Sequence, residues 1–244
     1  MKIIAITQRS LLLLALIFSL SAVAETSKNP DPFEGFNRKV FAFNEFADRW
    51  VLKPVATGYR WVTPDVVDKG VSNVFSNLGE VTTMVNNVCQ AKFANAGTDL
   101  GRFLINSTIG IVGVFDVASK MGLEKNDEDF GQTLAVWGVG DGPYLVLPFF
   151  GPSNLRDAFG RIPDVYTSPV SYVEDVPVRN TLRGVDIVDV RADLIDSEGL
   201  ITGDRYSFIR EVYRQNRDYK VNDGEVEDDF GDDFGDDDFG DDDF

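Results

Sequence analysis

The sequence predicts a mostly α-helical fold with one glycine- and proline-rich hairpin or loop segment. Helix-start signals recur along the chain, and apolar residues follow them at helical spacing. A segment rich in glycine and proline interrupts this helical pattern at residues 137–152. The chain has 244 residues, of which 43% are hydrophobic, and this length can bury the core of one large domain.

The first 24 residues have the pattern of a secretory signal peptide. Lys2 and Arg9 flank the start, an apolar stretch runs from Leu11 to Leu20, and Ala22-Val23-Ala24 is a small-residue cleavage pattern. The alternative is an uncleaved membrane anchor, but the apolar run is shorter than the ~20 residues that span a bilayer. No cysteine follows the cleavage pattern, so we expect an exported protein without the N-terminal cysteine of a lipoprotein.

The first predicted helix starts at Asp31 and has a wide apolar surface. Asp31 is a good N-cap, Pro32 suits the first helical position, and Glu34 completes a capping box. The apolar arc covers roughly 200°, against the ~100° of a typical surface helix. It contains Phe33, Phe36, Val40, Phe43, Phe46, Ala47, Trp50 and Val51, with Phe41 further around, beyond Asn37 and Asn44. Such a helix needs apolar neighbours on two sides. A helix buried in the centre of a soluble core also has such neighbours, so the composition leaves this alternative open.

The same signals predict further helices. Thr63-Pro64-Asp65 starts one, and Asn77 with Glu80 starts another. The stretch from Leu100 to Met121 is apolar but is interrupted by Asn106 and by glycines, so it is unsuited to an ordinary transmembrane span. We expect a buried or bilayer-interface helix pair here, packed closely at the glycines.

The segment from Trp137 to Pro152 is predicted to be a loop or hairpin. Its alternating glycines are followed by Pro143 and a β-like run, which does not fit a dinucleotide-binding loop. Glycines at its ends favour a movable gate, whereas a rigid turn required by the fold explains them equally well. Helical patterning returns with Ser153 as the candidate N-cap before Leu155, then over Val178 to Ile195, and from Asp204 onward.

Most of the negative charge lies at the C-terminus. The chain has 23 basic and 40 acidic side chains, a net charge of −17, and residues 221–244 repeat Gly-Asp-Asp-(Asp)-Phe. Low complexity and unshielded like charge predict a disordered, solubilising tail. Weak divalent-cation binding and docking to a basic partner are the alternatives. The acidic balance excludes a nucleic-acid binder, which needs basic stripes.

Composition also excludes several kinds of catalysis. The chain has no histidine and one cysteine, Cys89, so a histidine-based triad, a disulfide and a histidine metal site are impossible. No nucleophile-elbow or P-loop motif occurs. The acidic residues Glu124 and 127–129 are compatible with a paired-carboxylate hydrolase, but a solvated charged loop explains them better. We therefore expect a binder or conduit without cofactor or metal, and not an enzyme.

Several motifs occur together in an order typical of one family. They are Asp31-Pro32-Phe33-Glu34-Gly35-Phe36-Asn37-Arg38, Leu78-Gly79-Glu80, Phe103 to Gly110, Phe115-Asp116-Val117-Ala118 and Asp129 to Leu134. With Gly138 to Pro152 and Leu155-Arg156-Asp157, this series resembles the MlaA (VacJ) family over about residues 31–224.

The resemblance implies an outer-membrane component of Gram-negative phospholipid trafficking. Family members form a mostly helical ring in the inner leaflet, associate with trimeric porins and surround an amphipathic channel. Mislocalised phospholipids pass from the outer leaflet to a soluble periplasmic carrier, which maintains lipid asymmetry. The transport domain is then residues 25–220, between a signal peptide (1–24) and the acidic tail (221–244). Many members are lipoproteins, so the missing cysteine and the tail depart from the family pattern.

A phospholipid conduit needs an apolar path with a polar route for the headgroup, because exposed acyl chains cost ~0.8 kcal/mol per CH₂ in water. The amides of Asn37, Asn44 and Asn106 suit a headgroup, and interhelical hydrogen bonds are the alternative role. The candidates for the lipid path or gate are Asn37, Phe41, Asn44, Asn106, Gly138, Gly140, Gly142, Pro143, Tyr144, Pro148 and Gly151. Two other functions fit the same residues, a periplasmic lipid-binding carrier or scaffold and, less well, a lipid hydrolase.

Overall fold

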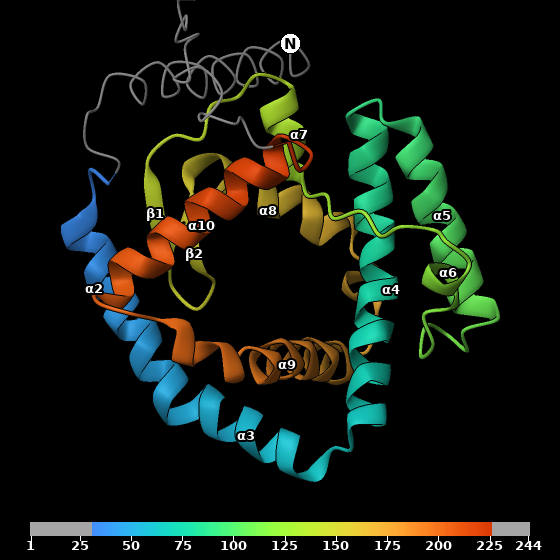
Figure 1. Cartoon of the computed structure of the whole chain (residues 1–244), viewed down its shortest axis with the longest axis horizontal. Coiled ribbons are helices and arrows are strands. Elements are labelled where there is room, and N and C mark those ends of the chain that lie inside the picture. Colours follow the sequence, from blue (N-terminus) through green and yellow to red (C-terminus); the bar gives the residue numbers. More distant parts are fainter. Residues whose placement is uncertain (1–30, 226–244) are drawn as a thin grey trace, which may run out of the picture.

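The structure is a ring built from helices (Figure 1). This computed structural model describes residues 31–225; the predicted signal peptide and the tail from residue 226 onward lie outside the described residues. A two-stranded hairpin lies inside the outline of the ring. The predicted mostly α-helical, ring-like bundle with one glycine- and proline-rich hairpin is therefore confirmed.

One side of the ring is a long bent helix. It consists of α2 (Glu34–Ala47), the π-helical turn η1 (Asp48–Leu52) and α3 (Lys53–Val62), which follow one another without a break. The N-cap position falls on Phe33, so the predicted start at Asp31-Pro32 is wrong. The Asp31 side chain is instead buried, where the Asn37 amide donates a hydrogen bond to it at 2.8 Å.

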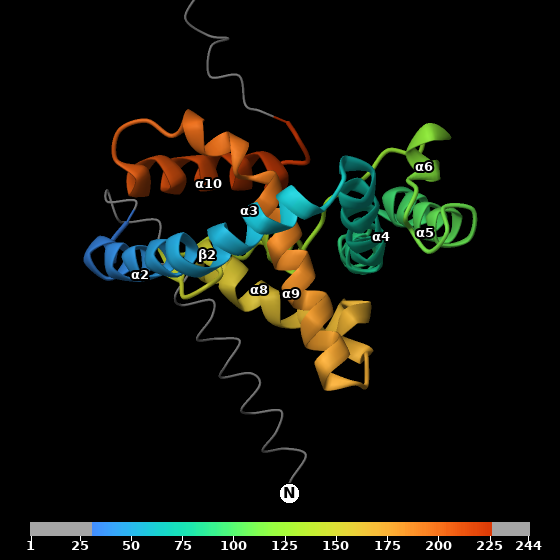
Figure 2. The ribbon, with the colours of Figure 1, turned by 90° about the horizontal axis from the view of Figure 1, so that it is seen from below.

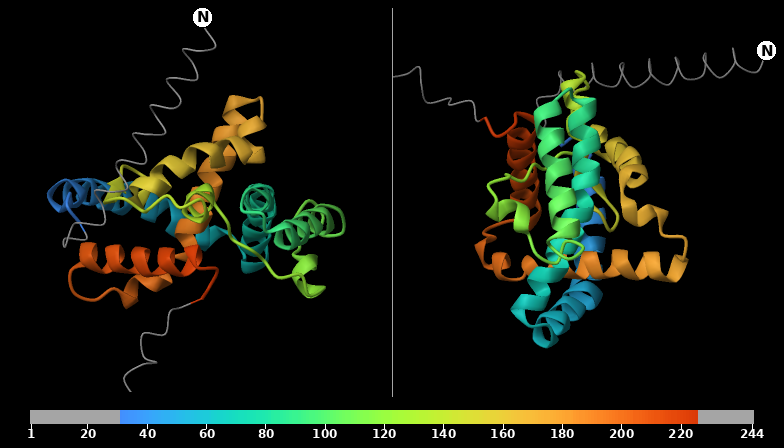
Figure 3. Two further views of the ribbon diagram at one scale, coloured as in Figure 1. Left: turned by 90° about the horizontal axis from the view of Figure 1, so that it is seen from above. Right: turned by 90° about the vertical axis from the view of Figure 1, so that its right-hand side faces the viewer.

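The opposite side of the ring is a helix hairpin of α4 (Asp65–Cys89) and α5 (Phe93–Thr108), which run side by side (Figures 1 and 3). The predicted second helix start at Asn77 and Glu80 is wrong, because α4 continues through both residues. Both are buried against α5. A capping-type residue inside a helix thus marks a polar helix–helix contact here.

The segment after α5 differs from the expected helix pair. A turn follows the end of α5, and α6 (Val117–Lys120) is a single helical turn. The expected close packing at glycines is confirmed, because a Cβ on Gly113 would lie 2.8 Å from the Cβ of Asn77. This contact fixes the turn against α4.

The glycine- and proline-rich segment forms the hairpin. Strand β1 (Tyr144–Leu147) pairs antiparallel with β2 (Gly151–Asn154). The helices α7 (Phe130–Val136) and α8 (Leu155–Thr167) flank it along the chain and pack on each other. Asn154 caps α8 by accepting the Asp157 amide at 2.7 Å, so the predicted cap at Ser153 is one residue too early.

The C-terminal third closes the ring. After the 3₁₀ turn η2 (Pro169–Tyr172), α9 (Val176–Asp193) runs from one face of the molecule to the other (Figure 2). The 3₁₀ turn η3 (Asp196–Leu200) leads to α10 (Arg205–Val221), which crosses the hairpin (Figure 1). The junction of α8 and α9 therefore lies on the face opposite α10 (Figure 2).

The acidic segment before α7 is solvated only in part, because Glu124 and Asp127 are exposed as the sequence predicts, whereas Glu128 and Asp129 are not. Glu128 is buried and forms an ion pair with Lys92 at 3.0 Å. Asp129 binds Arg217 of α10 through both carboxylate oxygens, at 2.5 and 2.7 Å. Burial opposes its ionisation, but the hydrogen bonds and charge of Arg217 outweigh this and lower the pKa of Asp129. The Asp129 carboxylate thus holds α10 on the ring.

Candidate functional site

The described part of the chain buries polar side chains and exposes large apolar ones. Apart from Tyr144, Val146 and Tyr206, its fully buried apolar residues are alanines. The largest fully buried polar side chains are Arg102, Glu80, Asn37, Asn86, Asn87, Thr133, Asp31, Asp99 and Ser153. A protein in water normally has the reverse arrangement. Large exposed apolar surfaces mark contact with a membrane, a ligand or a partner protein.

The bent helix α2–η1–α3 carries much of this exposed apolar surface. Its large exposed side chains include Phe33, Phe36, Phe43, Phe46, Trp50 and Trp61, and Trp61 is 87% exposed. The alternative of a helix in the centre of a soluble core is therefore wrong. No helix in the described region is long and apolar enough to cross a bilayer.

Two of the predicted path residues belong to the protein core. Phe41 packs edge-on against Tyr206 at 5.5 Å between ring centroids, and Tyr144 lies in the same cluster with Tyr213. Burial, together with the charge of Asp31, raises the pKa of Tyr144 to about 12. Phe41 and Tyr144 therefore hold α10 and the hairpin on α2.

Asn37 and Asn44 bind the backbone of the hairpin. Asn37, 0% exposed, donates to the carbonyl oxygen of Tyr144 at 3.0 Å and accepts the Val146 amide at 2.9 Å. Asn44 lies two helical turns later, where its amide donates to the Leu147 carbonyl oxygen at 2.9 Å. Both carboxamides thus act as extra partners of strand β1. Of the two roles that the sequence left open, intramolecular bonding is the one observed, from helix to hairpin.

Asn106 fastens the turn after α5. Its Oδ1 accepts the amides of Val117 and Ala118, both at 2.9 Å, and its Nδ2 donates to Asp116 at 3.1 Å. Asn106 is buried near the end of α5, and α5 lies across the ring from the hairpin (Figure 1). The structure therefore does not bring the three asparagines together, and each amide serves the fold.

The glycines of the predicted gate have different surroundings. Gly138 and Gly151 have φ angles of +85° and +78°, and a Cβ built at either position has no neighbour within 4 Å. At both positions the backbone conformation, and not a lack of space, favours glycine. Gly142 has φ +67°, and a Cβ there would lie 2.9 Å from the Cβ of Leu155. Gly140 is exposed before β1, Pro143 is half-buried, and Pro148 is exposed at the hairpin turn.

Two aromatic residues at this turn were not among the predicted path or gate residues. Phe149 and Phe150 are 77% and 67% exposed, and Phe149 has a φ of +66°, which is unusual for a bulky residue. The Phe149 ring packs edge-on against Phe43 at 5.1 Å. The signal was present as Pro148-Phe149-Phe150-Gly151, an apolar pair between turn residues. The turn thus presents an apolar tip supported by α2.

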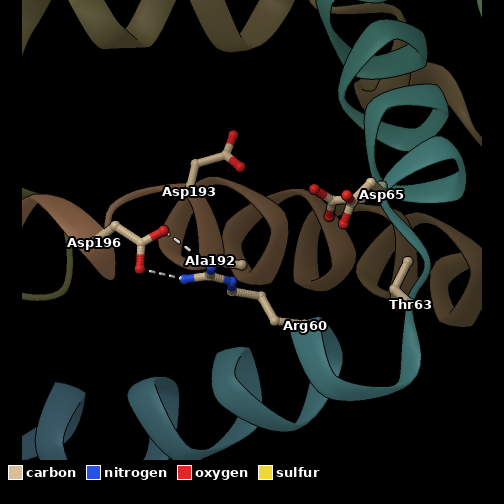
Figure 4. Close-up of a pocket in the computed structure, with 7 residues that line it drawn as sticks. Arg60, Thr63, Asp65, Ala192, Asp193 and Asp196 are labelled. Carbon is tan, nitrogen blue, oxygen red and sulfur yellow. Dashed lines mark hydrogen bonds and ion pairs between the residues drawn. The ribbon is translucent and has the colours of Figure 1, made fainter.

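A small polar cavity lies where α3, α4 and α9 meet (Figure 4). Its volume is about 150 Å³, and its lining residues are Arg60, Thr63, Asp65, Asp68, Ala192, Asp193 and Asp196. Arg60 binds Asp196 through two hydrogen bonds of 3.0 and 2.9 Å. Burial and the charges of Asp189 and Asp68 raise the pKa of Asp193. This lining is unsuited to acyl chains, and no cluster within residues 31–225 has the ligands for a metal ion.

Comparison with known proteins identifies the family. The model of the family described as "MlaA lipoprotein" matches residues 29–220. The chain belongs to the MlaA family. The family resemblance predicted from the motifs is confirmed.

Curated relatives extend this assignment. The chain is 34% identical over 218 residues to the Escherichia coli protein named "Intermembrane phospholipid transport system lipoprotein MlaA", covering 87% of this chain and 86% of that protein. The Haemophilus influenzae protein of the same name is 33% identical over 208 residues, 83% of each chain. A Rickettsia typhi protein is 46% identical over 143 residues, and this match spans 57% of that protein's length.

A solved structure has the same fold. It is reported as "Structural basis for maintenance of bacterial outer membrane lipid asymmetry" and matches with a TM-score of 0.70 at 36% identity. The match covers 78% of this MlaA-family chain and 98% of the other. The same fold is therefore found in that protein and is not particular to this sequence.

Proposed function

We propose that this MlaA-family chain is a passive conduit for phospholipids at the periplasmic side of the outer membrane. It removes mislocalised phospholipids from the outer leaflet and passes them to a soluble periplasmic carrier, which maintains lipid asymmetry. The observation that carries the proposal is the reversed arrangement of the ring, apolar outside and hydrogen-bonded inside. Such a ring is stable in hydrocarbon, where hydrogen bonds between helices replace the hydrophobic effect.

The relatives support the same role. Those from E. coli and H. influenzae are named as lipoproteins of an intermembrane phospholipid transport system. The matching solved structure concerns outer-membrane lipid asymmetry. The absence of histidine from the sequence supports a transport role without catalysis.

The segment from Gly138 to Gly151, which contains strand β1 and the hairpin turn, is the proposed gate. Its apolar tip at Phe149 and Phe150 offers a surface for acyl chains, and Gly138 and Gly151 are its hinges. Asn37 and Asn44 hold it in the observed position through four hydrogen bonds to the backbone. Opening then requires the outer pair of bonds, made by Asn44 next to the turn, to break first. Asn37 and Asn44 are thus positioning residues of the gate.

A trimeric porin is the proposed membrane partner, in line with the family resemblance. The large exposed aromatic residues of α2–η1–α3 suit the apolar wall of such a barrel as well as they suit acyl chains. A membrane contact of this kind helps to hold the chain at the outer membrane.

The direct test is deletion of the gene in the native host, scored by phospholipid exposed at the cell surface. We expect exposure to rise and to return to normal with the wild-type gene. Unchanged exposure contradicts the proposal. Lipids incubated with the purified protein should keep every ester bond by mass spectrometry, whereas a hydrolase releases fatty acid. Release of the protein into osmotic-shock fluid without detergent supports the soluble carrier instead.

A further inference from the structure

An arginine without an acidic partner lies beside the apolar tip of the hairpin. Arg161 of α8 is exposed, and its guanidinium carbon lies over the ring of Phe150, 5.4 Å from the ring centroid. Apart from this ring contact, Arg161 has no hydrogen bond or ion pair within residues 31–225. The buried arginines of the ring, such as Arg102 and Arg217, bind carboxylates of the chain instead. The charge of Arg161 is therefore available to a ligand.

The carboxylates nearest in the chain are already engaged. The segment 138–167, which contains the hairpin and α8, has three of them. Their partners are Arg156 for Asp141, Arg217 for Asp157 at 2.6 Å, and the Asn86 amide for Asp164 at 3.0 Å. None of the three forms an ion pair with Arg161 in this part of the structure.

Helix α2, which supports the tip through Phe43, also has its carboxylates paired. Glu34 binds Arg38 at 2.7 Å, and Glu45 binds Arg205 at 3.2 Å. The element on each side of the tip thus leaves the charge of Arg161 uncompensated.

The surroundings of Arg161 are apolar. Ile162 follows it directly, and Val165 lies one helical turn further along α8; both are exposed. Phe150 covers one face of the guanidinium and orients it. A guanidinium is weakly hydrated, and apolar neighbours lower the local dielectric constant, so an anion that binds here is held more strongly than in open water.

A phospholipid has the two chemical features that this arrangement can bind. Its phosphate is an anion that a guanidinium binds through two parallel hydrogen bonds. Its acyl chains begin only a glycerol unit away, so a phosphate at Arg161 brings them to the exposed rings of Phe149 and Phe150. Inorganic phosphate offers the same anion but has no group for the apolar tip.

We propose that Arg161 binds the phosphate of a phospholipid at the gate while the acyl chains contact Phe149 and Phe150. This inference rests on the proposed function and deepens it, because it assigns the headgroup contact to a cation and not to the asparagine amides that serve the fold. The phosphate is common to all glycerophospholipids. Recognition at Arg161 therefore admits different headgroups and excludes lipids without phosphate.

The test measures the binding of a short-chain lipid to the mature chain by ³¹P NMR. The probe is dihexanoylphosphatidylglycerol below its critical micelle concentration, and its phosphorus signal broadens when the lipid is bound. For Arg161→Gln we expect the affinity to fall roughly tenfold, because charge-assisted hydrogen bonds to the phosphate are lost. Arg161→Lys should lose less, because it keeps the charge without the planar fork. The matched control is Arg214→Gln, an exposed position on α10, which should bind as the wild type does.

Two further probes separate the phosphate from the acyl chains. Dihexanoylglycerol has the same chains without phosphate, and Arg161→Gln should leave its affinity, measured by saturation-transfer NMR, unchanged. Inorganic phosphate should bind far more weakly than the lipid. Circular dichroism should show the wild-type helical signal in both Arg161 variants, because the side chain has no hydrogen bond to lose.

Three outcomes contradict the proposal in distinguishable ways. Equal affinity of Arg161→Gln and the wild type for dihexanoylphosphatidylglycerol overturns the role of Arg161 and leaves the conduit standing. Equal affinity of the wild type for inorganic phosphate and for the lipid overturns the assignment to a lipid. A wild-type chain that binds neither lipid overturns the conduit together with this assignment.

Discussion

The Asn44 carboxamide accepts a hydrogen bond from the Phe149 amide at 2.8 Å, across 105 positions of the chain. The same side chain donates to the Leu147 carbonyl oxygen. One residue of α2 therefore binds the backbone on both sides of Pro148, at Leu147 and at Phe149. Phe149 has a left-handed backbone, and this pair of bonds helps to hold it there. The position of the apolar tip is therefore set by a helix that is remote in sequence.

Replacement of Asn44 should loosen the tip. For Asn44→Ala we expect a loss of about 1–2 kcal/mol of unfolding free energy, because two backbone groups lose their partners in a half-exposed place. Hydrogen exchange should become faster at residues 147–151, and phospholipid transport should change. The control is Asn180→Ala, an exposed asparagine on α9, which should alter neither. Equal exchange in the two variants contradicts a clamp at Asn44.

The crossing of α7 and α8 should not tolerate a methyl group. A Cβ on Gly160 would lie 2.6 Å from the backbone nitrogen of Gly131, so Gly160→Ala must push the two helices apart. We expect a loss of about 1–3 kcal/mol by thermal or denaturant unfolding. Gly184→Ala is the matched control, because Gly184 lies in α9 with nothing within 4 Å, and it should stabilise by up to about 1 kcal/mol.

The hinge glycines should affect transport more than fold. A Cβ at Gly138 or Gly151 meets no neighbour, so Gly138→Ala and Gly151→Ala should each cost about 1–2 kcal/mol through backbone strain alone. We expect altered surface exposure of phospholipid with an unchanged helical signal in circular dichroism. Loss of the helical signal would support a rigid turn required by the fold. Normal transport with a normal fold would remove the hinges from the gate.

Acid should weaken the fastening of the turn between α5 and α6, residues 109–116. Burial opposes ionisation of Asp116, but hydrogen bonds from Ser119 and Asn106 and the charge of Arg102 outweigh it and lower its pKa to about 2. A lowered folded-state pKa stabilises the fold above the ordinary value near 3.8. That contribution is lost as the pH falls from about 4 to about 2. Unfolding free energies across this window should decline less for Asp116→Asn than for the wild type.

The acidic tail should be dispensable for the conduit. A chain that ends at Asp223 keeps the ion pair of that residue with Lys92 and all of α10. We expect transport and membrane association near normal in cells, with lower solubility of the purified protein because the repulsive tail is missing. A transport defect with normal protein levels would favour the alternative in which the tail docks a basic partner.

The helix starts show how far local signals reach. Asp204 caps α10 within one helical turn, whereas α4 begins at Asp65 after Pro64 without a side-chain cap, and both helices begin where the sequence predicts. Asn77 and Glu80 carry the same local signal, yet they lie inside α4 and bind α5. A polar residue that finds a partner on another helix has no need to cap its own, and a local pattern does not contain that partner.

The candidate site likewise has some features that local sequence predicts and others that it does not. The glycine- and proline-rich hairpin was predictable because φ angles above zero select glycine locally. The roles of Asn37, Asn44 and Asn106 were not, because each amide binds backbone groups that local sequence does not place nearby. Phe149 and Phe150 were missed because exposure is a property of the folded surface and not of the residue type.

The sequence by itself determined the helical class, the hairpin segment and the family, since these rest on local periodicity, turn chemistry and ordered motifs. Only the tertiary structure decided which apolar faces point outward and which side-chain amides form hydrogen bonds inside the ring. Burial is set by neighbours from every part of the chain, so the same phenylalanine pattern on α2 describes a core helix or a membrane-facing one until those neighbours are in place.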